Sequence, residues 1–534
     1  MIKEKEGVNT PAIEYLELSA GMGKTYTTLK WIVADEIPKG SKWLYVGKNI
    51  ELLGESELLV KSFNKDVVTD SLHTNNCSGV LTSIITLLEG NVLPDILFIC
   101  HQSLINIIKA GREELLSGWS ILVDEVLEVF SIEDCKREKS QDTLFTNMVC
   151  LSEKHNMYTA IDGKSFMDKM AKDANYSSFG SSLNKILRCI DKGSRVYIRD
   201  SSRDTRVYTT YDVVPMKRVV STVGRFIMLG ARVKDTLHCR FMEKQGVSFI
   251  PFKGAIPLRD KYLNQSRVSI YYLTSEKRIR GCTSTLLETA YSYNKGKVVS
   301  KKDYRNLPNG VDDLGGDYKL VYQEYIERAC DLLGKDFIYT VNYIPFTKNY
   351  KDVSMDGFPR GRAVPYACHG LNHLQHYSKA LCLFCYKPSV DNKGILSFLS
   401  LMMDYPEIEE DFIDEKYRES SYQLCTRSKL RDFSDVQSEI TFVVPDKSVA
   451  EYIKSYHIPD CNILDDLVLY IPDKRENNGG SNRGFAGTHL KGDTAAQRAY
   501  GRYKKKYIKD SDKEPTTEES LSWLKLRNDK RDKK

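Results

Sequence analysis

The feature that most constrains this chain is the segment Ser19–Thr25 (SAGMGKT), which separates two stretches of different periodicity. The residues before it, Ile13–Leu18, are rich in apolar side chains and predict a strand, and the residues after it, about Tyr26–Ala34, predict a helix. A Gly-Lys-Thr turn between a strand and a helix is typical of a phosphate-binding loop. Its glycines let backbone N–H groups surround phosphate oxygens, and the helix N-terminus adds positive potential. We therefore expect an α/β domain that binds a nucleoside triphosphate.

Two residues of this loop have specific expected roles. Lys24 reaches the β and γ phosphates, and the hydroxyl of Thr25 holds Mg²⁺. The glycine that usually stands five residues before Gly23 is replaced by Leu18, so the loop has the shorter form G-x-G-K-T. We expect ATP to contact Ser19, Ala20, Gly21, Met22, Gly23, Lys24 and Thr25.

An acidic pair ends a later apolar strand. Residues Ile121–Val123 lead directly into Asp124 and Glu125, and Asp124 follows Thr25 by 99 residues. In a nucleotide-hydrolysing site, Asp124 coordinates Mg²⁺ through water and Glu125 acts as the general base. A solvated acidic strand end is the alternative, but an apolar strand that leads into both carboxylates favours the catalytic interpretation.

The rest of the chain predicts two α/β domains after a flexible N-terminus, residues 1–12. Strands separated by helical segments are typical of parallel sheets. The first domain, residues 13–255, has further strands at 42–46, 95–100, 120–125 and 224–230. The second domain, residues 256–474, has strands at 268–273, 337–341, 379–386 and 440–444.

Residues 131–220 interrupt the first series and are predicted to be an insertion. Their first part is polar and predicts a helix, whereas 195–199 and 206–211 predict a β-hairpin with a basic face. Arginines suit phosphates and tyrosines suit base stacking, so the hairpin is a candidate contact for nucleic acid. A hairpin that merely covers the first domain fits the sequence equally well. The candidate contacts are Arg195, Tyr197, Arg199, Arg206 and Tyr208.

Residues 475–534 are rich in Asn, Gly, Ser, Lys and Asp, and they predict a disordered basic tail. The last 34 residues carry 12 Lys or Arg against 7 Asp or Glu. The tail either adds non-specific affinity for a polyanion, binds a partner protein, or only improves solubility.

The loop and the acidic strand end resemble those of superfamily 2 helicases, the DExx-box group, particularly members encoded by bacteriophages. The box reads Asp124, Glu125, Val126 and Leu127, so it departs from both the DEAD and DEAH forms. The resemblance implies two RecA-like domains with ATP and Mg²⁺ between them. It also implies an ATP-dependent helicase or translocase acting on single-stranded DNA or a DNA junction rather than RNA. The setting would be phage-type replication, recombination or repair in the host cytoplasm, with replication proteins binding the insertion or the tail.

Other segments resemble further helicase motifs in the expected order. Val46–Ile50, Cys100–Leu104 and Cys368–Asn372 resemble the segments that touch the nucleic acid. Phe226–Arg232 occupies the place of the Ser-Ala-Thr coupling motif but keeps only Ala231. The nucleic-acid contacts that the resemblance implies are Lys48, Asn49, His101, Gln102, Gly370 and Asn372.

Gln423, Arg427 and Arg431 are spaced i, i+4 and i+8, which places them on one face of a helix. They resemble motif VI, Q-x-x-x-R-x-x-x-R, which implies that the two arginines act on the γ-phosphate as arginine fingers. A solvated basic face is the alternative. The position of the segment after the segment that resembles motif V favours the catalytic role.

Bulk properties limit the other classes of function. No apolar run reaches the roughly 18 residues of a membrane helix, so we expect no membrane association. The net charge of +6 permits a polyanionic partner without requiring one. Cys382 and Cys385 lie in an apolar strand and are expected to be core cysteines rather than zinc ligands. Two alternatives remain: an ATP-switched DNA-binding loader without unwinding activity, and a DNA-packaging ATPase, which needs a nuclease domain.

Overall fold

The computed structural model describes residues 11–138, 149–151, 157–160, 189, 194–254, 258–274, 286, 289–292, 297–299, 314–315, 318–341, 362–364, 374–469, 494–511, 515–516, 518–520 and 522–523. The chain divides into two compact units. The first comprises residues 1–289 and 320–470, and the second comprises 290–319 and 471–534.

The first sheet of the first unit has seven strands in the order β12-β1-β11-β5-β2-β4-β3, and every neighbouring pair is parallel. This confirms the predicted parallel sheet. The two edge strands, β3 and β12, were not predicted because each has only four residues and β3 is polar. The strands are β1 Ala12–Glu17, β2 Lys42–Gly47, β3 Thr69–Leu72, β4 Ile96–Cys100, β5 Trp119–Asp124, β11 Arg225–Gly230 and β12 Ser248–Pro251.

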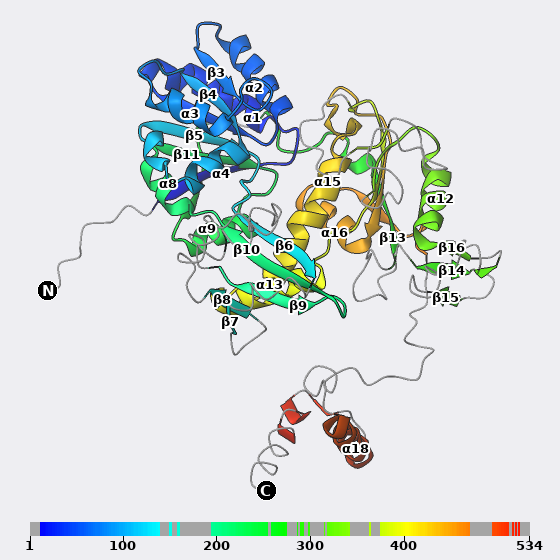
Figure 1. Cartoon of the computed structure of the whole chain (residues 1–534). Helices are drawn as coiled ribbons and strands as arrows, with labels where there is room; N and C mark the ends of the chain where they lie inside the picture. The colour runs from blue at the N-terminus through cyan, green and yellow to red at the C-terminus, as the bar shows by residue number, and fades with distance from the viewer. Residues whose placement is uncertain are drawn as a thin grey trace, which may run out of the picture. The chain divides into compact units, whose positions relative to one another are not determined.

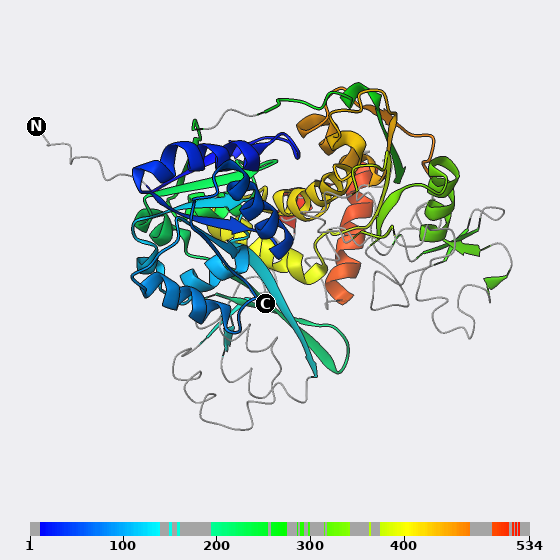
Figure 2. The ribbon, with the colours of Figure 1, turned by 90° about the horizontal axis from the view of Figure 1, so that it is seen from above.

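Helices cover both faces of this sheet (Figure 2). Strand β5 shows the consequence, because Ile121 and Val123 enter one hydrophobic core and Leu122 enters the other. A parallel sheet buried on both faces has nearly continuous apolar strands, as the sequence of β5 has. The helices are α1 Lys24–Trp31, α2 Ile50–Phe63, α3 Val80–Glu89, α4 His101–Lys109, α8 Met216–Thr222 and α9 Leu237–Lys244.

The second sheet of this unit has five parallel strands in the order β17-β18-β19-β13-β20. Strand β13 of this sheet is labelled in Figure 1. All four predicted strands are present, so the fold class is α/β with two RecA-like domains. The strands are β13 Val268–Thr274, β17 Ile338–Val341, β18 Lys379–Leu383, β19 Ile440–Asp446 and β20 Asn462–Leu464. The helices on this sheet include α12 Val321–Leu333, α15 Glu419–Cys425 and α16 Lys447–Tyr456.

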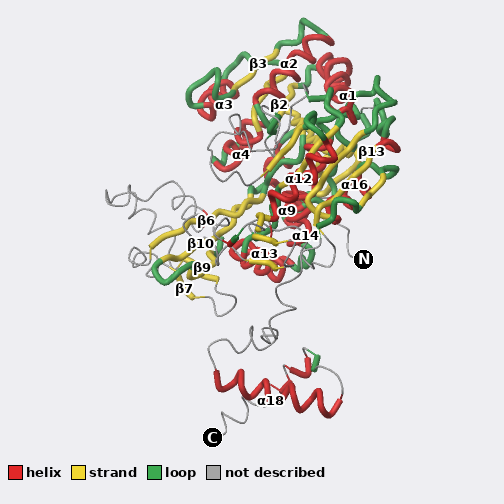
Figure 3. The backbone as a smooth tube through the Cα atoms, turned by 90° about the vertical axis from the view of Figure 1, so that its right-hand side faces the viewer, coloured by secondary structure: helices red, strands yellow, loops and turns green. Residues whose placement is uncertain are grey.

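The insertion forms an antiparallel sheet in the order β6-β10-β9-β8-β7, whose long strands run side by side in Figure 3. The predicted hairpin is present as β9 and β10. The predicted helix at the start of the insertion is wrong for β6, which pairs with β10 along its whole length. Tertiary strand pairing overrides the polar local sequence there. The strands are β6 Phe130–Glu138, β7 Val149–Leu151, β8 Met157–Ala160, β9 Val196–Asp200 and β10 Thr205–Val213.

The hairpin packs on α13 (Val390–Met403), which comes from the second half of the chain. The guanidinium of Arg195 lies 5.1 Å from the centre of the Phe398 ring. Arg199 donates to both carboxylate oxygens of Asp391, with an Nη2 to Oδ2 distance of 2.9 Å. Phe398 and its neighbours on α13 belong to the same hydrophobic core as the first sheet. The observed contacts are those of a hairpin that covers a helix.

We expect Arg199→Met to lower the free energy of unfolding by about 1–2 kcal/mol, because it removes a two-pronged, partly buried ion pair. Urea unfolding measures the loss, and a double-mutant cycle with Asp391→Asn isolates the pair. The control is Arg206→Met, since Arg206 Nε bonds Asp200 on the same hairpin and is expected to contribute less. Equal effects of the two variants would contradict the bracing role of Arg199.

The second unit contains a small sheet and a C-terminal helix. The strands β14 Ala290–Ser292, β15 Lys297–Val299 and β16 Tyr318–Leu320 pair in the order β15-β14-β16. Residues Thr494–Ser511 form the helix α18. The prediction of a disordered tail is therefore wrong for these residues. No helix among the described residues is long and apolar enough to cross a bilayer.

Candidate active site

The loop between β1 and α1 has a backbone that only glycine adopts readily. Gly21 and Gly23 have φ angles of +82° and +88°. A Cβ atom on Gly21 would lie 2.9 Å from Arg431 Nε, and one on Gly23 would lie 2.7 Å from Leu258 Cδ1. Two side chains from later in the chain, Arg431 and Leu258, therefore lie close to the loop. Glycine is needed at both positions, because it adopts the positive φ and leaves room for these side chains.

Lys24 is the first residue of α1, and its side chain turns back into the loop between β1 and α1. Its side chain is buried, and Nζ donates to the carbonyl oxygens of Leu18 at 2.7 Å and Ser19 at 3.4 Å. Burial lowers the pKa of Lys24, and the nearby Glu125 and Asp124 oppose that shift. A bound phosphate would give this buried ammonium a closer and stronger counter-charge than the carbonyls do.

The carboxylate of Asp124, at the end of β5, meets the first turn of α1. Its Oδ2 accepts hydrogen bonds from Thr25 Oγ1 and Tyr45 OH, each at 2.8 Å, and Ser56 Oγ donates to Tyr45 OH. Burial raises the pKa of Asp124, and the neighbouring Glu125 adds to the shift. Magnesium prefers oxygen ligands, so the paired oxygens of Thr25 and Asp124 fit Mg²⁺.

Glu125 has a left-handed backbone, with a φ of +72°. This conformation is unfavourable for a residue with a side chain and persists only where the surroundings enforce it, often at functional sites. Glu125 lines the same cavity as Lys24 and Thr25. The turn therefore holds a carboxylate at the place where a general base would act on water beside the γ-phosphate.

His101, predicted to touch nucleic acid, is instead buried beneath this turn. Its Nε2 donates to the backbone carbonyl oxygen of Asp124 at 2.8 Å. Burial lowers the pKa of His101 to about 4. The neutral imidazole therefore fixes the backbone at the Asp124 and Glu125 turn, which is a positioning role.

Stability is expected to depend on this histidine in mildly acidic solution. The pKa of His101 is lower in the folded chain than in the unfolded chain, where it is 6.5, so the unfolded state binds the proton more readily. The free energy of unfolding therefore falls as the pH is lowered from about 6.5 to about 4, by up to about 3 kcal/mol. Urea unfolding of wild type and His101→Gln at several pH values measures this, with His73→Gln as the control. An equal pH dependence of His101→Gln and wild type would contradict the assignment.

Two arginines from the second domain face the loop across a cavity of about 330 Å³. Arg427 is only 4% exposed. The Nε atoms of Arg427 and Arg431 are buried and have no hydrogen-bond partner among the described residues. Burial lowers the pKa of Arg431, and the charge of Arg427 adds to the shift. Burying two like charges beside each other is costly, so the two neighbouring arginines favour a polyanionic ligand in the cavity.

The predicted continuous helix through the three motif VI residues is wrong. Helix α15 ends at Cys425, so only Gln423 lies on it. Ser428 Oγ donates to the carbonyl oxygen of Cys425 at 2.6 Å, and Thr426 Oγ1 donates to that of Gln423 at 2.9 Å. Such side-chain bonds compete with helix continuation. Gln423 Nε2 bonds Glu419 Oε1 at 2.7 Å, and Gln423 lines a second cavity rather than the one that holds the arginines.

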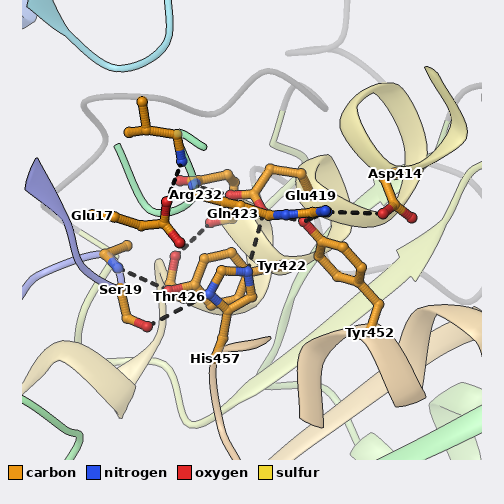
Figure 4. A network of polar contacts seen from close by, with 12 residues as sticks. Glu17, Ser19, Arg232, Asp414, Glu419, Tyr422, Gln423, Thr426, Tyr452 and His457 are labelled. Carbon is orange, nitrogen blue, oxygen red and sulfur yellow. Dashed lines mark hydrogen bonds and ion pairs between the residues drawn. The ribbon is translucent and has the colours of Figure 1, made fainter. Parts of the chain in front are cut away.

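Two tyrosines of the second domain hold the loop between β1 and α1, and no sequence motif indicated them. Ala20 N–H donates to Tyr422 OH at 2.8 Å, and Tyr262 OH donates to the Ala20 carbonyl oxygen at 2.7 Å. The Tyr422 ring stacks on His457, with centroids 3.5 Å apart, beside Ser19 (Figure 4). Only the folded chain brings these residues together, because Tyr422 lies 402 residues after Ala20.

Arg232, at the end of the segment that keeps only Ala231 of the coupling motif, also links the two domains. Its Nη1 donates to Asp414 Oδ2 at 2.8 Å (Figure 4). The next two backbone N–H groups, of Val233 and Lys234, donate to Glu17 Oε2. In the sequence, this role of the segment was indicated only by its place in the order of the helicase-like motifs. The segment Arg232–Lys234 therefore joins the end of β1 to the π-helical turn Asp414–Arg418 that precedes α15.

The remaining predicted nucleic-acid residues lie at several places. Asn49 caps α2 by accepting from Leu52 N–H at 2.9 Å, and Lys48 pairs with Glu128 at 3.6 Å. Gln102 is exposed and bonds Asn106. Tyr208 is buried in the insertion. The segment with Gly370 and Asn372 lies outside the described residues.

No protein-family model and no curated protein matches the chain. Among solved structures, it is similar to Xpd4 of S. tokodaii, with 11% identity, coverage of 85% of this chain and 96% of that chain, and a TM-score of 0.43. Mss116p bound to ssRNA and AMP-PNP is 9% identical over 85% and 71% of the two chains, with a TM-score of 0.35. S. cerevisiae Dbp5 bound to RNA and ADP BeF3 is 8% identical over 85% of each chain, with a TM-score of 0.31. The function proposed below rests on the geometry of the site.

Proposed function

We propose that this chain is an ATP-driven nucleic-acid motor of the superfamily 2 helicase class, acting on single-stranded DNA or a DNA junction. The observation that carries the proposal is the pair of buried guanidinium groups, Arg427 and Arg431, which face the phosphate loop of the other domain. One domain supplies the phosphate loop and the carboxylates, and the other supplies the cations. A ligand with several negative charges draws these two walls together.

The residues divide the chemistry between them. Lys24 and the loop N–H groups bind the phosphates, and Glu125 removes a proton from the attacking water. Mg²⁺, held by Thr25 and Asp124, would supply positive charge for the β and γ phosphates. Arg427 stabilises the charge that develops on the γ-phosphate. Loss of that charge on product release weakens the link between the domains, and this cycle would drive movement along a strand.

Steady-state ATP hydrolysis by the full chain, measured alone, with single-stranded DNA and with single-stranded RNA of the same sequence, tests the proposal. We expect DNA to stimulate hydrolysis about tenfold or more and RNA to stimulate it less. A rate of ATP hydrolysis that neither DNA nor RNA changes would exclude a nucleic-acid motor. Stimulation by RNA alone would instead assign RNA as the substrate.

Strand separation requires a second measurement, because hydrolysis alone does not distinguish a helicase from a loader. Forked DNA with a 3′ or a 5′ single-stranded arm, labelled to report separation, tests both directions of movement. We expect separation of the fork with the 3′ arm, because the resemblance to superfamily 2 helicases suggests movement from 3′ to 5′. DNA-stimulated hydrolysis without separation of either fork would favour an ATP-switched loader.

A further inference from the structure

Helix α18 in the second unit concentrates positive charge. Its 18 residues, Thr494–Ser511, contain six Lys or Arg and one acidic residue, Asp510, so the helix has a net charge of +5. The whole chain of 534 residues has a net charge of only +6. The basic excess of the protein therefore lies almost entirely in a segment that forms one helix.

One face of α18 is covered by the residues that follow it. The rings of Tyr500 and Tyr503 lie 5.5 Å and 5.1 Å from the Trp523 ring, and the Tyr503 ring stacks on it at 19°. Tyr500 OH and Ser520 Oγ are 2.9 Å apart, and both residues are buried. Tyr507 bonds Glu519. The aromatic face of the helix is thus used in a small internal core.

The exposed basic residues lie on the other side of this helix. Arg502, Lys505 and Lys506 are exposed, and they are spaced i, i+3 and i+4. At 3.6 residues per turn this spacing groups them on one face, away from the positions of the tyrosines.

Such a stripe is unfavourable for an isolated helix. Like charges at i, i+3 and i+4 destabilise a helix by about 0.2–0.5 kcal/mol for each pair. A helix that only needs a solvated face usually alternates acidic and basic residues. A stripe of positive charges alone therefore indicates that a polyanion binds there and offsets the repulsion between the basic side chains. A membrane surface is disfavoured, because interfacial helices insert an apolar face and the aromatic face of α18 is already covered.

We propose that α18 is a nucleic-acid-binding element in its own right, whose residues Arg502, Lys505 and Lys506 bind backbone phosphates. Binding is expected to be sensitive to salt and insensitive to base sequence, because the neighbouring tyrosines pack on Trp523 and are not available for stacking. The proposal goes beyond the motor activity, since no residue of the nucleotide site takes part in it.

The test is a triple variant of the full chain, Arg502→Gln with Lys505→Gln and Lys506→Gln. The matched control replaces three exposed lysines of the first unit by glutamine: Lys30, Lys65 and Lys244. The dissociation constant for a labelled single-stranded DNA, measured by fluorescence anisotropy without nucleotide, is followed across salt concentrations. We expect the triple variant to bind about tenfold more weakly at 0.1 M salt. The slope of the logarithm of the binding constant against the logarithm of the salt concentration is expected to become shallower by about 2, at roughly 0.7 for each cation removed. The control is expected to retain the wild-type affinity and slope.

Unchanged affinity and slope in the triple variant, or an equal loss in the control, would overturn the proposal. It would also be overturned if the triple variant kept its DNA affinity but lost binding to phosphatidylserine vesicles or to an acidic peptide. Arg502→Lys, which keeps the charge, is expected to bind like wild type, which separates loss of charge from damage to the helix. ATP hydrolysis by the wild-type chain without nucleic acid reports on the motor separately, so the two proposals fail independently.

Discussion

Replacement of Lys24 by alanine is expected to lower the rate of ATP hydrolysis by about a hundredfold or more. The ammonium is buried in the loop and donates to backbone carbonyl oxygens there, at 2.7 Å to Leu18 and 3.4 Å to Ser19. A γ-phosphate would replace these neutral acceptors with charged ones as negative charge shifts during hydrolysis. The transition state therefore loses more stabilisation than the ground state, and kcat falls more than nucleotide affinity does.

Single-turnover and steady-state hydrolysis measure this effect, and binding of a fluorescent nucleotide measures the affinity separately. Lys30→Ala is the matched control, since Lys30 lies exposed on the same helix. Thermal unfolding checks that both variants fold. A Lys24→Ala protein that hydrolyses ATP within a few-fold of wild type would refute the assignment of the loop.

Replacement of Arg427 by methionine is expected to slow hydrolysis by about a thousandfold, within the range of arginine fingers. Nucleotide binding is expected to change little, because the loop of the first domain makes most of the phosphate contacts. Without nucleotide the variant should be as stable as wild type or more stable. The reason is that Arg427 is 4% exposed and its Nε has no hydrogen-bond partner among the described residues, so methionine removes a charge whose burial is costly.

A variant that hydrolyses ATP more slowly but unfolds at the same or a higher temperature has lost a catalytic group and not a structural one, so the two measurements together make the test specific. Hydrolysis with saturating nucleic acid gives the first, and thermal unfolding without nucleotide gives the second. Arg267→Met is the control, because Arg267 lies in the same domain and pairs with Glu439 at an exposed site. A clear fall in the unfolding temperature of Arg427→Met would show a structural partner for this guanidinium and contradict the ligand-binding role.

The parts of the fold that were predicted correctly depend on local signals. Strand β5 could be predicted because an apolar run ends in Asp124 and Glu125, and a strand buried on both faces needs such a run. The glycine-rich turn between β1 and α1 could be predicted because Gly21 and Gly23 occupy left-handed positions that glycine favours. Each of these features is encoded within about ten neighbouring residues.

The incorrect predictions concern features that distant residues decide. The polar strand β6 is a strand only because β10 supplies its hydrogen-bond partners. Helix α15 stops before Arg427 because hydroxyl groups of Thr426 and Ser428 take up its last carbonyl oxygens. His101 was predicted at a nucleic-acid surface, but the packing of α4 against β5 buries it beneath Asp124.

Short-range patterns in the sequence were enough to predict the α/β class, the two parallel series of strands and the glycine-rich loop after β1, because periodicity and turn chemistry act over short distances. The groups that hold this loop from the other domain became visible only in the folded chain: Tyr262, Tyr422 and Arg431. It also decided that the insertion braces α13 through Arg199 and Asp391. These contacts join residues that lie 192 or more positions apart in the sequence, and their free energy depends on burial and pairing, which no local pattern encodes.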